Sequence, residues 1–364
     1  MRTPRPLLAL HARPLLLLPV AALVAAGTLF AVSATADATN SNAANANASG
    51  ATDATQTPAP AATRGVIDVS TAAQLKDAIS AARPGDTIQL ADGTYRGNFK
   101  TSVAGSASSR ITLTGSSKAV LTASGGYGLH LNGASYWTVK GLTVTGGQKG
   151  IMADAARGVV IDSVTVHGLD MEGVHFRHSS KDGVIKDSRI YDTGRDGRGM
   201  GEGVYVGGAG DLGDNSDNVE IRGNTIGPGV GGENIDIKEG TTGAKIIGNT
   251  FDGSGLTGTH YDDSWVDVKG NDVLVENNTG THTTNNGYET HTQQSGWGCG
   301  TVFRGNESDL SDASGSGRYG FNITNYDAAD CPVTITGDNT VTGGRGIANP
   351  GVPVHFAPPA EPAS

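Results

Sequence analysis

Two segments with nearly the same pattern, ENIDIKEGT at 233–241 and SWVDVKGND at 264–272, decide the fold of this chain. Each holds an apolar–Asp–apolar–Lys run, and Asp236 and Asp267 lie 31 residues apart. Similar strand-like segments recur at steps of 22 to 31 residues: GLHLNG (128–133), GIMADA (150–155), GVHFRH (173–178), GVYVGG (203–208), ETHTQQ (289–294) and GFNITN (320–325). Such recurrence of short strands over most of a chain is typical of a repeat architecture.

A second strand-like segment follows most of these repeats and ends in a polar corner residue. The corner residues are Ser163, Ser188, Asn224, Asn249, Asn278, Asn306 and Asn339. In stacked repeats such side chains can bond to one another and satisfy the backbone at the bend. The repeat is too short for a β-propeller, and it lacks the regularly spaced leucines of a leucine-rich repeat protein. We therefore predict an all-β fold, a right-handed parallel β-helix, in which only stacking of the rungs buries their apolar faces.

The start of the repeat region predicts a cap for the open end of this solenoid. The segment 68–97 is compatible with a strand, a short amphipathic helix capped by Ser70, a Pro-Gly turn and another strand. We expect the helix near 71–82. The stretch PGDTIQLADGTYRG at 84–97 resembles the opening of the pectate-lyase-like superfamily, closest to the polysaccharide lyases that include chondroitinase B and alginate lyases. The resemblance covers roughly 66–345.

The two ends of the chain differ in composition from the repeats. Residues 1–36 hold three arginines, an apolar run and the triplet ATA, which is typical of a secretory signal peptide. Residues 37–64 are rich in Ala, Thr and Asn and predict a disordered linker. We expect the β-helix domain over 65–348 and a flexible tail over 349–364.

Charge and cysteine usage agree with an exported protein. Removal of 1–36 changes the net charge from −10 to −13, because this segment holds three arginines and no acidic residue. We therefore expect a secreted monomer that binds neither nucleic acid nor, after cleavage of the signal, a membrane. Cys299 and Cys331 precede the corner residues Asn306 and Asn339 by seven and eight residues. This places them on adjacent rungs, and we predict a disulfide between them.

Alternation along the first strand of each rung predicts which side chains face the core. The expected inward pairs are Leu129/Leu131, Ile151/Ala153, Val174/Phe176, Val204/Val206, Ile235/Ile237, Val266/Val268, Thr290/Thr292 and Phe321/Ile323. The residues between them are expected to face solvent in two columns. One column reads His130, Met152, His175, Tyr205, Asp236, Asp267, His291, Asn322, and the other Asn132, Asp154, Arg177, Gly207, Lys238, Lys269, Gln293, Thr324.

The repeated Asp-x-Lys should therefore stack Asp on Asp and Lys on Lys, about 4.8 Å apart. Directly opposed like charges cost stability, so the pattern calls for an explanation. A diagonal lattice of salt bridges is the structural one. The functional one is a cleft for an extended polymer, since long loops precede these strands on one side. It would use Asp236, Asp267, Lys238 and Lys269 as catalytic residues and His175, Arg177, Tyr205, His291 and Trp265 in substrate binding.

β-Elimination on a uronate polysaccharide fits this set. It needs a base for the C5 proton, positive charge for the adjacent carboxylate and an acid at the glycosidic oxygen. Stacked lysines should lower each other's pKa, which favours Lys238 as the base. The resemblance implies a Lys base, an Arg on a nearby rung and calcium; here Lys269 stands in place of that Arg. Glu202 and Glu233, with Asp236 and Asp267, are the candidate calcium ligands.

Two alternatives remain open at this stage. Asp236 and Asp267 could act as the acid and the nucleophile or base of a glycoside hydrolase, since one rung separates them. A β-helix that binds glycans without cleaving them is also compatible with the pattern. The expected substrate in the first case is an extended, anionic polysaccharide.

Overall fold

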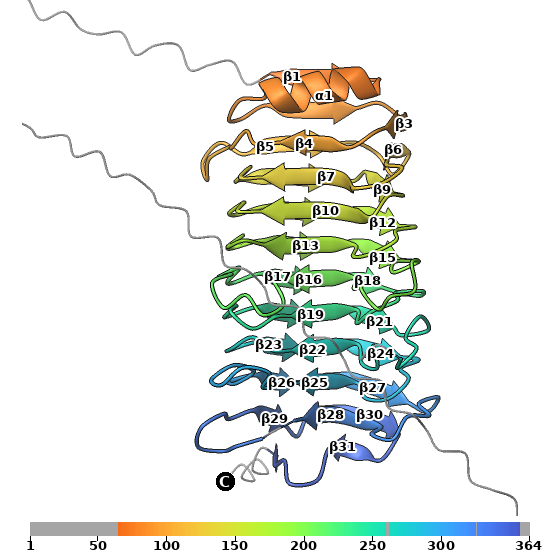
Figure 1. The fold of residues 1–364 in the computed structure, drawn as a ribbon, viewed down its shortest axis with the longest axis vertical. Coiled ribbons are helices and arrows are strands. Elements are labelled where there is room, and N and C mark those ends of the chain that lie inside the picture. Colours follow the sequence, from red (N-terminus) through yellow and green to blue (C-terminus); the bar gives the residue numbers. More distant parts are fainter. Residues whose placement is uncertain (1–64, 260–261, 325, 357–364) are drawn as a thin grey trace, which may run out of the picture. The chain divides into compact units, whose positions relative to one another are not determined.

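The computed structural model of the protein describes residues 65–259, 262–324 and 326–356. Their strands form three parallel sheets that run along a solenoid, one strand of each sheet per rung (Figure 1). The predicted right-handed parallel β-helix is confirmed. The predicted signal peptide (1–36) and linker (37–64) lie outside the described residues.

The first sheet has twelve strands. In order along the sheet they are β1 (Val66–Val69), β2 (Thr87–Leu90), β5 (Ile111–Thr114), β8 (Trp137–Lys140), β11 (Val160–Asp162), β14 (Val184–Lys186), β17 (Glu220–Arg222), β20 (Lys245–Ile247), β23 (Leu274–Glu276), β26 (Val302–Arg304), β29 (Thr334–Thr336) and β32 (Val354–His355).

The second sheet, which we call the groove sheet, has ten strands. They are β4 (Phe99–Thr101), β7 (Tyr127–Asn132), β10 (Lys149–Asp154), β13 (Val174–Arg177), β16 (Val204–Val206), β19 (Ile235–Ile237), β22 (Val266–Val268), β25 (Tyr288–Thr290), β28 (Tyr319–Ile323) and β31 (Gly346–Ala348). The third sheet comprises β3 (Gly93–Arg96), β6 (Ala119–Thr122), β9 (Thr143–Thr145), β12 (Thr165–His167), β15 (Arg189–Tyr191), β18 (Thr225–Ile226), β21 (Thr250–Asp252), β24 (Thr279–Thr281), β27 (Glu307–Leu310) and β30 (Thr340–Gly343).

The core is a continuous column of apolar side chains between the three sheets. Inward residues of the groove sheet stack on their equivalents, as Ile235 does on Val204 and Val266. These side chains are fully buried. Each rung thus covers the apolar face of its neighbours, which is the dominant stabilising contribution in such a solenoid.

A short helix closes the N-terminal end of the solenoid, as predicted (Figure 1). α1 spans Ala72–Ala81 and buries Leu75, Ala78 and Ile79. Its N-cap is Thr71 rather than Ser70. The Thr71 hydroxyl accepts from the Gln74 backbone and the Gln74 side chain accepts from the Thr71 backbone, a reciprocal capping box that Ser70 is one residue too early to form.

Polar corner residues form a hydrogen-bonded ladder inside the bend after the first sheet. Asn249 accepts from the backbone and the amide group of Asn224, and its own amide donates to the Ile221 carbonyl and to Asn278. The same pattern continues through Asn306 and Asn339. Ser163 is not part of the ladder: the strand register aligns it with Asp187, and it is exposed.

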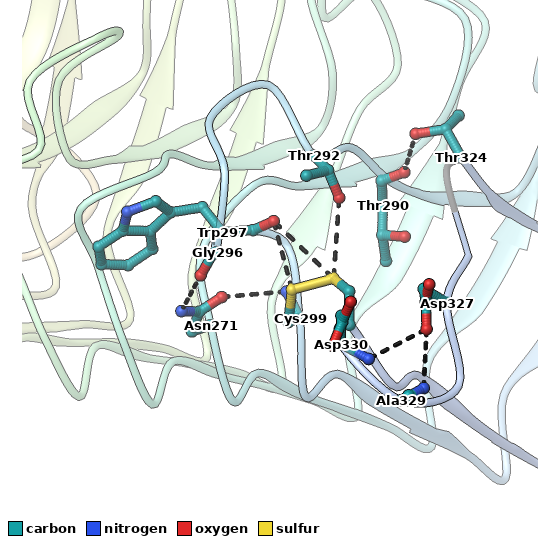
Figure 2. Close-up of a disulfide and its surroundings, with 11 residues drawn as sticks. Asn271, Thr290, Thr292, Gly296, Trp297, Cys299, Thr324, Asp327, Ala329 and Asp330 are labelled. Carbon is teal, nitrogen blue, oxygen red and sulfur yellow. Dashed lines mark hydrogen bonds between the residues drawn. A yellow bond between two sulfur atoms is a disulfide. The ribbon is translucent and has the colours of Figure 1, made fainter.

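The predicted disulfide is present and joins adjacent rungs near the C-terminal end (Figure 2). The Cα atoms of Cys299 and Cys331 are 4.7 Å apart. The Asn271 side chain accepts from the Cys299 backbone and donates to the Gly296 carbonyl, so the loop before the bond is tied to the rung beneath it.

The C-terminal boundary differs from the prediction. Residues 349–356 were expected to belong to a flexible tail, but β32 pairs with β29 and extends the first sheet. The unpaired edge of β29 explains this, since it offers backbone groups for one more strand. Residues 357–364 lie outside the described part. Within that described part, no helix is long and apolar enough to cross a membrane.

The Asn ladder generates a stability prediction. Asn249→Ala leaves the Asn224 backbone N–H buried without its side-chain acceptor and removes the amide that donates to the Ile221 carbonyl. This should lower the free energy of unfolding by about 2 kcal/mol. Urea unfolding followed by circular dichroism measures the change. The control Thr250→Ala alters the exposed side chain of the next residue, at the start of β21, and should change stability by less than about 0.5 kcal/mol. Equal effects of the two substitutions would contradict a role for the ladder.

Candidate active site

The groove sheet places polar side chains of successive rungs next to one another. Tyr205 pairs with Asp236, Asp236 with Asp267, and Asp267 with Glu289. The register thus confirms the predicted stacking of Asp236 on Asp267. These side chains do not face open solvent, however. Asp236 is 1% exposed and Asp267 4%. Residues of the loops before the strands, such as Asp263 and Asn285, line the same cavity as these aspartates.

A cavity of about 460 Å³ lies over these rungs. Five predicted catalytic or binding residues line it: Asp236, Lys238, Asp267, Lys269 and His291. Glu202 and Glu233, predicted as metal ligands, also line it. Gln293 and Asn322, which the alignment of repeats places in the outward columns, line it as well. Four further lining residues are not predicted from the sequence: Gly199, Asp263, Asn285 and Glu289.

A network of ion pairs offsets the repulsion between the stacked like charges. Lys269 Nζ lies 3.0 Å from Asp236 Oδ1 and 2.5 Å from Asp267 Oδ2. Lys238 Nζ lies 2.5 Å from Asp236 Oδ2. Opposite charges therefore alternate across the two rungs, and the diagonal lattice considered from the sequence is present. It forms the floor of the cavity, so the structural and functional explanations coincide here.

The network reverses the expected effect on the lysines. Burial alone would lower the pKa of Lys238, but the neighbouring Asp236 carboxylate more than offsets this and raises it. The pKa of Lys269 is likewise lowered by burial and raised, on balance, by Asp236 and Asp267. The prediction that stacking lowers the lysine pKa is therefore wrong, because each ammonium group is in direct contact with a carboxylate. For Lys269, the effect of Asp236 and Asp267 outweighs that of Lys238. Both lysines are charged at neutral pH.

His291 completes the network on the C-terminal side. Its Nδ1 lies 2.7 Å from Asp267 Oδ1, and its Nε2 lies 3.4 Å from Glu289 Oε2. Burial lowers the pKa of His291, but Asp267 outweighs it and the pKa is raised above the ordinary 6.5. Burial raises the pKa of Asp267, and Lys269 and His291 reverse this to a net lowering. A neutral His291 that donates from Nδ1 to Asp267 presents Nε2 as a proton acceptor.

Carboxyl groups with raised pKa values lie on the other side of the lysines. Burial, with the nearby Asp236 and Glu172, raises the pKa of Glu202 to about 8. Burial and Asp236 also raise the pKa of Glu233 well above its usual value. The Glu202 atom Oε2 is buried without a hydrogen-bond partner among the described residues. Glu202 is therefore a protonated carboxylic acid at neutral pH.

Other predicted binding residues do not line this cavity. His175 is buried, its Nε2 lies 2.8 Å from the Gly207 carbonyl, and burial lowers its pKa to about 3. Arg177 lies two rungs before Asp236 and is bound to Asp154 on the rung before its own. Tyr205 is 8% exposed and packs its ring 5.0 Å from Lys238 Nζ. Its contact orients the lysine rather than a sugar.

The prediction that Trp265 binds the substrate is wrong. The side chain is fully buried in the core, where Nε1 donates to the Thr281 carbonyl. Glu289 was missed because the rung was aligned two residues late. Tyr288 and Thr290, not Thr290 and Thr292, face inward here. The alternation in GYETHT allows both alignments, and only the bulk of Tyr288 could have favoured the correct one.

The carboxyl cluster does not fit the calcium ion that the resemblance implies. Oxygen atoms of Glu202, Glu233 and Asp236 lie within 4.8 Å of one another. Calcium takes about six to eight oxygen ligands. Both oxygens of Asp236 instead lie against ammonium groups, which would repel a cation bound there. We assign no catalytic step to calcium.

Two shallower depressions extend the cavity. One, of about 270 Å³, shares Gly199 with it and is lined by the glycine-rich loop that carries Arg195. The other, of about 300 Å³, shares Asp263 and Asn285 and is lined by hydroxyl groups. The two depressions also share Thr257 with each other, so the central cavity continues along the loops that precede the groove-sheet strands.

Comparison with known proteins agrees with this architecture. The family model described as "Right handed beta helix region" matches residues 127–212. The crystal structure of an alginate lyase from Paenibacillus sp. str. FPU-7 is 37% identical, with a TM-score of 0.68, and the match covers 80% of this chain and 98% of that one. No curated protein matches the sequence.

More distant structures share the fold. The pectate lyase Pel9A is 15% identical, with a TM-score of 0.53, over 76% of this chain and 79% of its own. A GH136 lacto-N-biosidase from Eubacterium ramulus is 12% identical, with a TM-score of 0.53, over 80% of this chain and 68% of its own. Taken with the rungs, the capping helix and the 37% identical alginate lyase, these matches show that the chain belongs to the pectate-lyase-like superfamily of right-handed parallel β-helix proteins.

Proposed function

We propose that the protein is a polysaccharide lyase that cleaves a uronate polymer by β-elimination. The observation that carries the proposal is that one cavity brings together a charged ammonium group, a protonated carboxyl group and a histidine backed by a carboxylate. These are Lys238, Glu202 and His291. The 37% identity to an alginate lyase supports the same chemistry.

Lys238 serves to neutralise the substrate carboxylate. β-Elimination requires removal of the C5 proton, which becomes more acidic when the adjacent carboxylate loses its negative charge. The Lys238 side chain is 12% exposed, whereas that of Lys269 is 4% exposed, so Lys238 is the ammonium group that reaches the ligand. Asp236 and the Tyr205 ring hold it in position. This role replaces the predicted role as base, because a lysine with a raised pKa is a poor proton acceptor.

His291 is the proposed base and Glu202 the proposed acid. Nε2 of neutral His291 takes the C5 proton, and the electron pair of the C5–H bond forms the C4–C5 double bond. The C4–O bond breaks, and the leaving oxygen takes the proton of Glu202. The products are an unsaturated uronate at one new end and a free hydroxyl at the other. The raised pKa values suit both groups to work near neutral pH.

A glycoside hydrolase is the second candidate, but not through the predicted pair. All four carboxylate oxygens of Asp236 and Asp267 lie against Lys238, Lys269 or His291, so none is available as an acid or nucleophile. Glu202 and Glu289 favour this candidate instead. Their pKa values are raised to about 8 and about 7, as a hydrolytic acid requires.

The proposal also covers the charge of the substrate, the export of the protein and its oligomeric state. We propose that the substrate is anionic, because the reaction needs a uronate carboxylate. We also propose that the protein is exported by its N-terminal segment and acts as a monomer. Immunodetection in the culture medium, with the mass of the exported chain, tests export and signal cleavage together.

Product analysis distinguishes the candidate reactions. The purified protein should produce ultraviolet-absorbing unsaturated ends from at least one polymer in a panel of alginate, pectate and glycosaminoglycans. New reducing ends without new absorbance would identify a hydrolase. Binding without either product would identify a carbohydrate-binding protein.

Substitutions of Lys238 test whether it acts as a charge or as a base. Lys238→Met should lower turnover by about 10²-fold, the scale for losing one electrostatic contact to a reacting group. Lys238→Arg keeps a permanent positive charge and should stay within about tenfold of the native protein. Initial rates of absorbance increase measure both. Lys245→Met, an exposed lysine of the first sheet, is the matched control. Equal loss in the Met and Arg variants would return Lys238 to the role of base.

The rate should depend on pH through His291 and Glu202. His291 must be neutral to accept a proton, so activity rises as pH increases through its pKa above 6.5. Glu202 must be protonated to donate, so activity falls as pH increases through about 8. The expected profile of kcat/KM is a narrow bell. His291→Asn and Glu202→Gln should each remove one limb of the bell together with most of the turnover. Unaltered limbs would assign the acid and base to other groups.

A further inference from the structure

Lys269 lies at the centre of the carboxylate network and has the surroundings of a bound cation. Its ammonium group bridges Asp236 and Asp267, which come from adjacent rungs, at 3.0 and 2.5 Å. The Lys269 side chain is 4% exposed, and the other oxygen of Asp236 is bound by Lys238. A lysine this buried is unusual unless its charge is needed to compensate others.

The other oxygens of the two aspartates are also engaged. Lys238 occupies the second oxygen of Asp236, and His291 the second oxygen of Asp267. Two carboxylates thus meet two lysine ammonium groups, so the charges cancel before any ion from solvent binds. A divalent cation placed against Asp236 would lie close to both ammonium groups and would be repelled by them.

The nearby glutamates complete the outline of a cation site. Oxygens of Glu202, Glu233 and Asp236 come within 4.8 Å of one another, a spacing that three calcium ligands can have. Both oxygens of Asp236, however, are already bound by the ammonium groups of Lys238 and Lys269. The triad therefore has the spacing of a cation site, with lysine charge at the carboxylate that a metal ion would need.

We propose that the Lys269 ammonium group is a built-in substitute for a divalent metal ion, fixed by the chain at the position where the carboxylates converge. The site then keeps Asp236, Asp267 and Lys238 in place without calcium. The binding part of this inference is independent of the reaction. Its catalytic consequence, that uronate cleavage needs no metal, depends on the proposed lyase function.

Removing the ammonium group should create a calcium site. In Lys269→Met, Asp236 and Asp267 lose their shared counter-ion, which leaves carboxylate oxygens of both residues, beside Glu202 and Glu233, free to bind a metal ion. Calorimetric titration with calcium chloride should show about one ion bound per chain, at least about tenfold more tightly than in the native protein. Calcium should also restore much of the lost melting temperature, because a ligand that binds only the folded state stabilises it.

Two further variants keep the test decisive. Lys269→Gln retains a hydrogen-bond donor and should fold even if Lys269→Met does not; it should also gain calcium affinity. Lys186→Met removes a lysine paired with Asp162 on the first sheet and should gain none. Calcium affinity in the native protein equal to that of the Lys269 variants would overturn the proposal. So would a stable Lys269 variant that binds no calcium.

The native protein provides the catalytic arm. Treatment with EDTA should leave its melting temperature and its rate on uronate polymers unchanged within about twofold. A loss of rate that calcium restores would overturn the inference while leaving the lyase function intact. If no uronate polymer is cleaved, the lyase function fails, but the calcium titrations still decide what Lys269 does.

Discussion

In a parallel β-helix every side chain lies next to its own equivalent one rung away, and this constraint governs the rest of the structure. At about 4.8 Å, equivalent residues must tolerate one another. Apolar residues do so by packing, and asparagines do so by donating along the ladder. Asp236 and Asp267 are forced together by the same geometry. Their repulsion is relieved because each repeat also carries a lysine two residues later, and because His291 pairs with Asp267.

The relief of that repulsion is also what organises the cavity. Lys269 is held between two carboxylates, Lys238 is turned toward the ligand side, and His291 is oriented by the remaining oxygen of Asp267. The charges are therefore arranged before a substrate arrives. A preorganised set of charges in a partly enclosed site stabilises a transition state more than mobile charges in water would. The cluster that keeps the rungs compatible is the one proposed to perform the chemistry.

Much of this fold could be predicted from the sequence, because the same alternation of inward and outward residues recurs in successive rungs. Asp236 and Asp267 were aligned correctly, since apolar neighbours on both sides leave one possible alternation. The register of the rung at Tyr288 cannot be predicted, because the residues of GYETHT alternate equally well in two registers. The direction of Trp265 cannot be predicted either, since the first position of a strand-like segment can face the core or the solvent. The cavity itself, the burial of the aspartates and the balance of charges on Lys238 depend on loops whose path no local pattern specifies.

The cap and the active cluster lie at different heights of the solenoid, and this separation has a consequence for how the protein can change. Contacts in the sheets join only neighbouring rungs, from α1 at one end to β31 and β32 at the other. Duplication of a rung between β4 and β13 would lengthen the molecule while leaving the two Asp-x-Lys rungs and both ends intact. The length of the surface available to a polymer can therefore change in evolution by one rung at a time, without a change in the Asp-x-Lys rungs.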